Sequence, residues 1–249
     1  MTRRPAAVVF DVDGTLVDSE RHGHRVAFNE AFAEAGLPYR WDEELYGELL
    51  AVPGGRRRLH HYLTEQSHTP AAEIDTLASR LHEDKTARFR KLAAEGHIPA
   101  RPGVERLLDE LAAADVTLAV ASTGQRTWVE PLLDRLFGLD RFAVVVGGED
   151  VSRLKPDPEA YRETVRRLGT SPARVVAVED SAKGVAAAVD AGLVCLDVVN
   201  DYTRDEVPEG AALVVDGFGN PGRVRVLRGR AEVLDDGAVT ASTLGRLLT

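Results

Sequence analysis

The sequence predicts an α/β fold in which a parallel β-sheet carries a separate all-helical unit. Short apolar runs rich in valine alternate with helical segments in the second half of the chain. One similar run stands alone at residues 6–10, and the long stretch that follows it has apolar side chains at helical spacing. Strands that alternate with helices are typical of a parallel sheet covered on both faces, so the first run joins that sheet.

The second half of the chain supplies most of the predicted sheet. Short apolar runs predict strands at residues 116–121, 144–146, 175–178, 194–199 and 213–215. Helical spacing predicts helices near residues 103–114, 125–137, 157–168 and 181–191. Residues 1–17 and 98–249 are therefore expected to form one α/β core.

Residues 18–97 are expected to form an all-helical domain inserted after the first strand. Helices are predicted at residues 18–36, 42–51, 55–66 and 71–95. Breaks that contain glycine or proline separate these segments, and no convincing strand interrupts them.

The last segment begins at Gly217 and predicts a loop, a hairpin across residues 224–233 and a short terminal helix. The loop, Gly217 to Gly222, fits the pattern Gly-x-Gly-x-x-Gly that marks dinucleotide sites. Pro221 blocks the helix that such a site requires, so we interpret this segment as an ordinary loop.

Composition excludes several classes of protein. The 249 residues include 31 basic and 40 acidic side chains, and the net charge of −9 argues against a general nucleic-acid binder. The lone Cys195 excludes an internal disulfide framework, fits a reducing cytosol and is expected to be a buried small hydrophobe. No apolar run approaches the ~18 residues of a membrane span. We expect a cytoplasmic protein that binds no membrane, and a monomer because no heptad pattern is present.

Polar residues follow four of the predicted strands, where each strand ends or shortly after it. They are Asp11 and Asp13, Ser122 and Thr123, Lys155, and Glu179 and Asp180. The carboxyl ends of parallel strands share one edge of the sheet, which is where open α/β sheets bind ligands. Each group alone fits an ordinary turn or helix cap. Four such groups in succession indicate a site.

The segment from Asp11 to Thr15, Asp-Val-Asp-Gly-Thr, resembles the nucleophile motif of the haloacid dehalogenase superfamily of phosphohydrolases. The three later groups match the remaining motifs of that superfamily in order and residue type. The resemblance covers nearly the whole chain. It implies a Rossmann-like parallel sheet core with an inserted helical cap, and phosphoryl transfer that depends on Mg²⁺.

Phosphoryl transfer requires a nucleophile, neutralisation of charge and management of the leaving group's proton. Asp11 is the expected nucleophile, which forms an aspartyl-phosphate that water later hydrolyses. Asp13 is placed to protonate the leaving oxygen and then to deprotonate the water. Mg²⁺ prefers oxygen ligands, and a plausible set is one oxygen of Asp11, the backbone carbonyl of Asp13, and Asp180 with Glu179.

Ser122 and Lys155 are expected to hold the phosphoryl oxygens, as a hydroxyl donor and a point charge respectively. Lys155 should also keep Asp11 ionised. Thr123 follows Ser122 and is a candidate contact for the substrate.

The helical insertion narrows the resemblance. Residues 18–29, Trp41, Tyr46 and the run from Gly54 to Leu59 resemble the cap of CbbY-like sugar bisphosphatases in the β-phosphoglucomutase-like branch. These enzymes are similar to xylulose-1,5-bisphosphate phosphatases, which remove the 1-phosphate. The implied substrate contacts are Glu20, His24, Tyr46, Gly54, Gly55 and Arg56.

The residues themselves give partial support to these contacts. Gly54 and Gly55 let the backbone approach a ligand, and Arg56 begins a basic run that could meet a distal phosphate. A lysine commonly follows the glycine pair in the resembled family, so Arg56 is a departure. Glu20 and His24 share a helix face. Three alternatives stay open: Glu20 has a surface role, His24 has a core role, and the arginines form a solvated helix face.

The alternatives fall into other functional classes. A β-phosphoglucomutase-like sugar phosphomutase uses the same residues, and a phosphoglycolate-type monophosphatase would differ in substrate. A receiver-type signalling module also combines acidic residues, a hydroxyl and a lysine around Mg²⁺, but it has no need of a helical lid. A catalytically dead binding protein is disfavoured because no motif position is degraded.

Overall fold

The chain divides into two compact units. The computed structural model describes residues 4–52, 54–66, 70–206, 208–219 and 222–249. The core unit comprises Met1–Asp18 and Ala100–Thr249, and the helical unit comprises Ser19–Pro99. These boundaries lie within two residues of those predicted.

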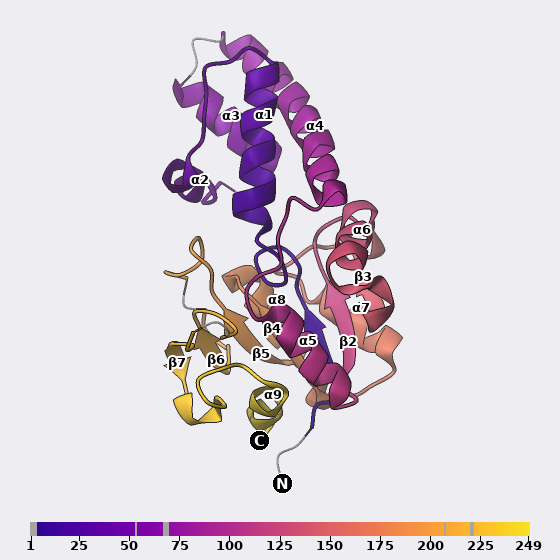
Figure 1. The fold of residues 1–249 in the computed structure, drawn as a ribbon. Helices are drawn as coiled ribbons and strands as arrows, with labels where there is room; N and C mark the ends of the chain where they lie inside the picture. The colour runs from indigo at the N-terminus through magenta and orange to yellow at the C-terminus, as the bar shows by residue number, and fades with distance from the viewer. Residues whose placement is uncertain (1–3, 53, 67–69, 207, 220–221) are drawn as a thin grey trace. The chain divides into compact units, whose positions relative to one another are not determined.

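A seven-stranded sheet forms the centre of the core unit within the described residues (Figure 1). Its strands are β1 (Ala7–Phe10), β2 (Thr117–Ala121), β3 (Phe142–Val146), β4 (Val175–Glu179), β5 (Val194–Val198), β6 (Leu213–Val215) and β7 (Val226–Gly229). Their order is β3-β2-β1-β4-β5-β6-β7, and all pairs are parallel except β6 with β7. The fold is α/β with a Rossmann-like parallel sheet, as predicted.

Strand order determines which helices cover which face. The described core unit contains α5 (Val104–Ala113), α6 (Arg126–Phe137), α7 (Glu159–Leu168), α8 (Ala182–Asp190) and α9 (Ala241–Leu247). The connections through α5 and α6 step toward the β3 edge, whereas those through α7 and α8 step toward the β7 edge. Since such crossovers are right-handed, the two pairs of helices lie on opposite faces. Every residue of β1 and β4 is buried as a result.

The same order creates a switch point between β1 and β4. The chain leaves β1 for β2 on one side and leaves β4 for β5 on the other. Phe10 pairs with Val178 of β4 and with Val120 of β2, so the ends of these three strands lie level. A crevice outside the carboxyl ends of the strands is expected at such a point.

The hairpin predicted across residues 224–233 is wrong. Only Val226–Gly229 forms a strand there, and it pairs antiparallel with β6 rather than with its own continuation. Ala231–Val233 forms a 3₁₀ turn instead. The alternation of apolar residues correctly predicted a strand, but that strand pairs with β6 at the edge of the sheet. Asn220 and Pro221, on which the loop interpretation rests, lie outside the described residues.

The helical unit is built around aromatic side chains. Its described helices are the π-helical turn η1 (Glu20–His24), α1 (Arg25–Glu34), α2 (Glu43–Leu49), α3 (Gly55–Gln66) and α4 (Ala71–Glu95). Phe28, Phe32 and Trp41 pack together, and the amide side chain of Asn29 both accepts from and donates to the backbone of Trp41. Within the described residues, no helix combines the length and apolar character of a membrane span.

Short 3₁₀ turns complete the described connections of the core unit. They are η2 (Leu139–Arg141), η3 (Gly148–Asp150), η4 (Pro172–Arg174) and η5 (Ala231–Val233). Cys195 is free and buried on the face that α8 covers, as predicted.

Replacing Gly103 by alanine is expected to destabilise the core unit. Gly103 has a φ of +86°, and a Cβ there would lie 2.3 Å from the carbonyl oxygen of Gly219. Gly169 has a φ of +63° with nothing within 4 Å, so Gly169→Ala incurs only the backbone strain. Urea unfolding should show a loss of roughly 1 kcal/mol for Gly169→Ala and about 2–4 kcal/mol for Gly103→Ala. Equal losses would contradict the close approach of the C-terminal segment to α5.

Candidate active site

The loop after β1 brings the first two aspartates to the carboxyl edge of the sheet. Asp11 is buried, and its backbone N–H donates to Val178 of the neighbouring strand β4 over 3.0 Å. Asp13 lies two residues further along and is half-buried. Gly14 then turns the chain with a φ of +80°. A Cβ at Gly14 would lie 2.3 Å from Oδ2 of Asp180, so only glycine leaves room for that carboxylate.

The end of β4 supplies two further buried carboxylates, Glu179 and Asp180. Glu179 lies against the first turn of α8, where a Cβ at Gly184 would come within 2.1 Å of its carboxylate atoms. Asp180 accepts hydrogen bonds from the hydroxyl of Thr15 at 3.0 Å and from Nδ2 of Asn200 at 2.7 Å. Steric room and directed donors therefore hold both carboxylates in place.

Lys155 joins the ends of three strands. Its Nζ lies 2.6 Å from Oδ1 of Asp11 and 2.5 Å from Oε1 of Glu179, and it donates to the carbonyl of Ala121 at 2.8 Å. The buried hydroxyl of Tyr161 also donates to Oε1 of Glu179, over 2.7 Å. A single ammonium thus connects the β1, β2 and β4 ends of the site.

Burial dominates the electrostatics of the cluster. It raises the pKa of Asp11 to about 8; Lys155 opposes that rise, and Glu179 and Asp13 add to it. Burial, with repulsion from Asp11 and Glu179, also raises the pKa of Asp180 well above its usual range. Burial alone would lower the pKa of Lys155, but the two carboxylates at its Nζ raise it above its ordinary value. The lysine is therefore fully charged.

The cluster has the composition of a divalent cation site. Among the described residues, Asp11, Glu179 and Asp180 offer carboxylate oxygens that all lie within 4.8 Å of one another. One lysine does not neutralise three buried carboxylates, and burial, together with repulsion among these carboxylates, raises the pKa values of Asp11 and Asp180. Oxygen donors with excess negative charge fit a hard cation such as Mg²⁺.

Ser122 and Thr123 follow the end of β2 at the same edge. Ser122 is buried, and its hydroxyl oxygen accepts a hydrogen bond from the backbone N–H of Gly124 at 2.9 Å. Thr123 is exposed. The structure thus gives Ser122 a fixed position in the loop, while the side chain of Thr123 reaches solvent.

Two of the predicted cap residues, Glu20 and Tyr46, are connected by hydrogen bonds within the helical unit. The hydroxyl of Tyr46 donates to Oε2 of Glu20 and accepts from Arg58 at 3.2 Å. Arg58 is buried and also donates from Nε to the carbonyl of Leu49 at 2.9 Å. Glu20, Tyr46 and Arg58 therefore form one polar chain across η1, α2 and α3.

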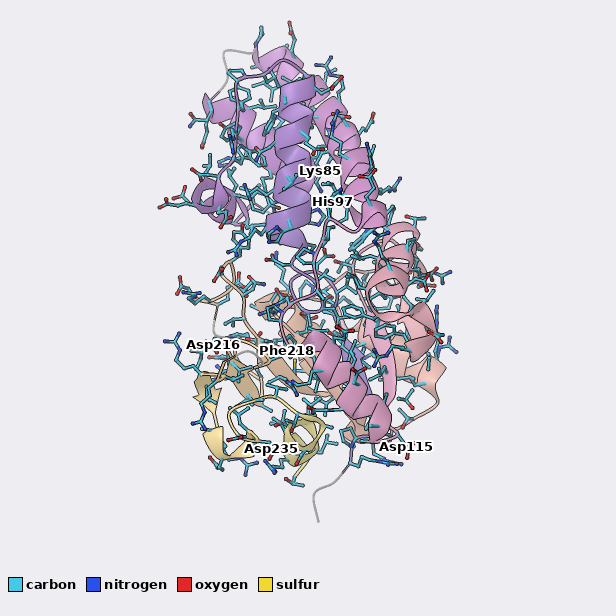
Figure 2. All side chains as sticks on the ribbon, viewed as in Figure 1. Lys85, His97, Asp115, Asp216, Phe218 and Asp235 are labelled. Carbon is cyan, nitrogen blue, oxygen red and sulfur yellow. The ribbon has the colours of Figure 1, made fainter. Side chains whose placement is uncertain are left out.

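His24 belongs to a second group in the helical unit. Its ring stacks on Phe89 with centroids 3.9 Å apart, and its Nδ1 lies 2.8 Å from Nζ of the buried Lys85. Figure 2 labels Lys85 on α4. The Nζ of Lys85 also lies over the rings of Phe28 and Phe89. The sequence left open whether His24 has a core role. This aromatic enclosure agrees better with that core role than with a solvated one.

The glycine pair and Arg56 lie at the start of α3. Gly54 has a φ of +87°, and a Cβ at Gly55 would approach the ring of His82 to 3.0 Å. Gly55 therefore serves packing inside the unit. Arg56 is about half exposed and pairs with Asp75 of α4 at 2.6 Å. Its guanidinium is thus engaged by a carboxylate of the same unit.

Sequence reasoning assigned no role to Asn200 and Tyr161, which support the cluster, or to Lys85 of the helical unit. Asn200 follows the end of β5, so the rule that identified the other strand ends could have found it. Tyr161 lies six residues after Lys155, inside α7, and no local pattern distinguishes it from a core tyrosine. Lys85 occupies a helix in which most lysines would be solvated. Its enclosure by Phe28 and Phe89 depends on tertiary packing alone.

Comparison with known proteins identifies the family. Residues 5–192 match the model of haloacid dehalogenase-like hydrolases. Protein CbbY of Cereibacter sphaeroides is 42% identical over 219 residues, covering 87% of this chain and 94% of its own. A CBBY-like protein of Arabidopsis thaliana is 39% identical over 228 residues, covering 89% of this chain and 72% of its own.

A solved structure agrees in fold as well as in sequence. It shows a mutant of CbbY from Rhodobacter sphaeroides in complex with xylulose-(1,5)bisphosphate. Its TM-score is 0.72 at 39% identity, with 87% of this chain and 97% of that chain covered. The chain described here therefore belongs to the haloacid dehalogenase-like hydrolases and is a phosphatase, a phosphoric monoester hydrolase of that family.

Proposed function

We propose that the chain is a Mg²⁺-dependent phosphatase that hydrolyses a small sugar bisphosphate through an aspartyl-phosphate on Asp11. The observation that carries this proposal is the contact between Asp11 and Lys155 at 2.6 Å, inside a cluster with Glu179 and Asp180. A buried carboxylate that keeps a charged lysine beside it can act as a nucleophile while the lysine meets the incoming phosphoryl oxygens.

Each step has a residue in this chain. Asp11 attacks phosphorus through the oxygen that does not face Lys155, and the leaving alkoxide takes a proton from Asp13. Asp13 then accepts a proton from the water that hydrolyses the acyl phosphate. Ser122 and Lys155 hold the phosphoryl oxygens during both transfers. Asp11, Asp180 and Glu179, with the backbone carbonyl of Asp13, would hold Mg²⁺, which would neutralise charge on the phosphoryl group.

The preferred substrate is xylulose-1,5-bisphosphate, with loss of its 1-phosphate. Support comes from the similarity to a CbbY mutant whose complex contains that compound. The helical unit is the proposed cap that selects the sugar, with Glu20 and Tyr46 as polar contacts and Thr123 as a contact from the core. Gly54 and Arg56 complete the proposed set, whereas the packing of Gly55 and His24 inside the unit gives those two residues a supporting role. A phosphomutase would use the same residues and pass the phosphoryl group to a sugar hydroxyl instead of water.

Asp11→Asn is expected to abolish phosphate release, by at least about 10³-fold in kcat, because the amide cannot form an acyl phosphate. Phosphate release should be measured with saturating Mg²⁺ on a sugar bisphosphate. The unfolding midpoint serves as the control. Measured in a chelator at neutral pH it should change little, because the buried Asp11 carboxyl is then protonated, the amide has nearly the same shape, and Lys155 stays paired with Glu179. Turnover like that of the unmodified protein would contradict the proposal.

Arg56→Ala is expected to lower kcat/KM for sugar bisphosphates about tenfold and to leave sugar monophosphates unchanged, since only the former carry a distal phosphate. Arg57→Ala is the matched control, because its exposed side chain follows directly in the same helix. A fall on both substrate types, or the same fall for both variants, would remove Arg56 from the distal phosphate.

The same screen separates the phosphatase from the mutase. Free phosphate in equal amount to the substrate consumed is the expected product. An isomerised sugar phosphate that forms without free phosphate would establish the mutase and contradict the hydrolytic proposal.

Removal of divalent cations is expected to make the folded protein less stable as the pH rises. The pKa of Asp11 is about 8 in the folded state without a cation, against 3.8 ordinarily. Between these values the folded protein retains a proton that the unfolded chain has lost, so the free energy of unfolding falls as the pH rises from about 4 to about 8. Urea unfolding in a chelator should show this fall, and Mg²⁺ should oppose it. A flat profile in the chelator would count against the buried charge.

A further inference from the structure

Two hydrogen bonds fix the carboxylate of Asp180, and they come from two different loops of the core unit. Thr15, in the loop after β1, donates to Oδ1 at 3.0 Å. Asn200, in the loop after β5, donates to Oδ2 at 2.7 Å. The two oxygens are therefore oriented only when both loops hold their positions. The structure provides a common support for the two loops.

That support is the guanidinium of Arg101. Its Nη1 donates to the carbonyl of Gly14 at 2.6 Å and to that of Val198 at 2.8 Å, and its Nη2 donates to the carbonyl of Val199 at 2.8 Å. Gly14 immediately precedes Thr15, and Val199 immediately precedes Asn200. One rigid fork thus binds the peptide group just before each donor to Asp180.

We propose that Arg101 is a positioning residue for Asp180, which it orients through Gly14–Thr15 on one side and Val199–Asn200 on the other. Its guanidinium hydrogen-bonds to backbone carbonyls of the two loops and lies near enough for its charge to act on Asp180, so Arg101→Lys, which keeps the charge, isolates the geometric effect. The proposal rests on the proposed function in one respect, because it takes Asp180 as a Mg²⁺ ligand.

The C-terminal segment holds Arg101 in turn. The guanidinium lies 5.6 Å from the ring centroid of Phe218, which is buried. Figure 2 labels Phe218, and the structure places its Cβ beside the N-terminus of α5 at Gly103. The backbone N–H of Arg101 also donates to the carbonyl of Leu16 at 3.0 Å. Arg101 therefore connects the segment after β6, through Phe218, with the loop that carries the expected nucleophile.

Arg106 offers a matched control within the same unit. Its Nη2 donates to the carbonyls of Phe218 at 3.0 Å and Val239 at 2.8 Å, and it approaches that of Gly219 at 3.4 Å. It is thus another guanidinium that meets several backbone carbonyls and anchors the same C-terminal segment. Its hydrogen bonds within the described residues reach Glu110 and the C-terminal segment rather than the loops that carry Thr15 and Asn200, so its loss should affect stability alone.

The test compares Arg101→Lys with Arg106→Lys by isothermal titration of MgCl₂ into the chelator-treated protein, in a buffer free of phosphate. Lysine retains the charge but cannot reach three carbonyls with one fixed fork. Residues that orient metal ligands typically change affinity by 10–100-fold, so we expect Arg101→Lys to weaken Mg²⁺ binding by about 10–100-fold. Arg106→Lys should stay within about twofold of the unmodified protein, an interval set by the precision of the measurement.

A double variant tests the route. Asn200→Ala removes one of the donors that Arg101 supports. If the two act through the same carboxylate, Arg101→Lys with Asn200→Ala should weaken binding by less than the product of the two single effects. If the double variant weakens binding by the full product of the two single effects, the proposed route is overturned.

Further outcomes are decisive as well. Equal Mg²⁺ affinities for Arg101→Lys and the unmodified protein, or equal losses for Arg101→Lys and Arg106→Lys, would overturn the positioning role and leave the phosphatase proposal intact. Absence of Mg²⁺ binding by the unmodified protein would overturn both. If Arg101→Lys fails to fold, Phe218→Leu loosens the same guanidinium without removing a donor, and unchanged Mg²⁺ affinity in that variant would overturn the proposal.

Discussion

Repulsion among buried carboxylates is the constraint on which the rest of the core unit depends. Carboxylate oxygens of Asp11, Glu179 and Asp180 lie within 4.8 Å of one another, and all three residues are buried. Such a group is unfavourable unless positive charge and hydrogen-bond donors surround it. Lys155 supplies part of the charge, and Thr15, Asn200 and Tyr161 supply donors. The remaining charge has to come with the ligand, so stability and activity meet at the same atoms.

The parallel sheet makes this concentration of charge possible. Strands β1, β2 and β4 end level, and each ends in polar residues that a different part of the sequence contributes. The buried strands fix the height of the site, while the loops after them fix the directions of the side chains. Arg101 and Asn200 show that these loops are themselves held by bonds between segments far apart in sequence.

Much of this could be predicted from the sequence, for physical reasons that differ by element. The period of the apolar residues identified β1 to β6 and the main helices, because burial on both faces of a parallel sheet leaves continuous runs of valine. The order of Asp11, Lys155 and Asp180 identified the site, since chemistry restricts those residue types. The pairing of β7 was missed because alternation predicts a strand but not its partner. Arg101 was missed because its partners are carbonyl groups, which leave no trace in side-chain pattern.

Two glycines give the site a further property that concerns evolution. Side chains at Gly14 or Gly184 would occupy the space of the carboxylates of Asp180 and Glu179. These two positions therefore tolerate no side chain, because the Cβ atom of any other residue would already displace a carboxylate of the cluster. Adaptation to a new sugar meets a lower barrier at exposed positions of Ser19–Pro99, such as Arg56. We expect relatives with different substrates to share the core and to diverge in the helical unit.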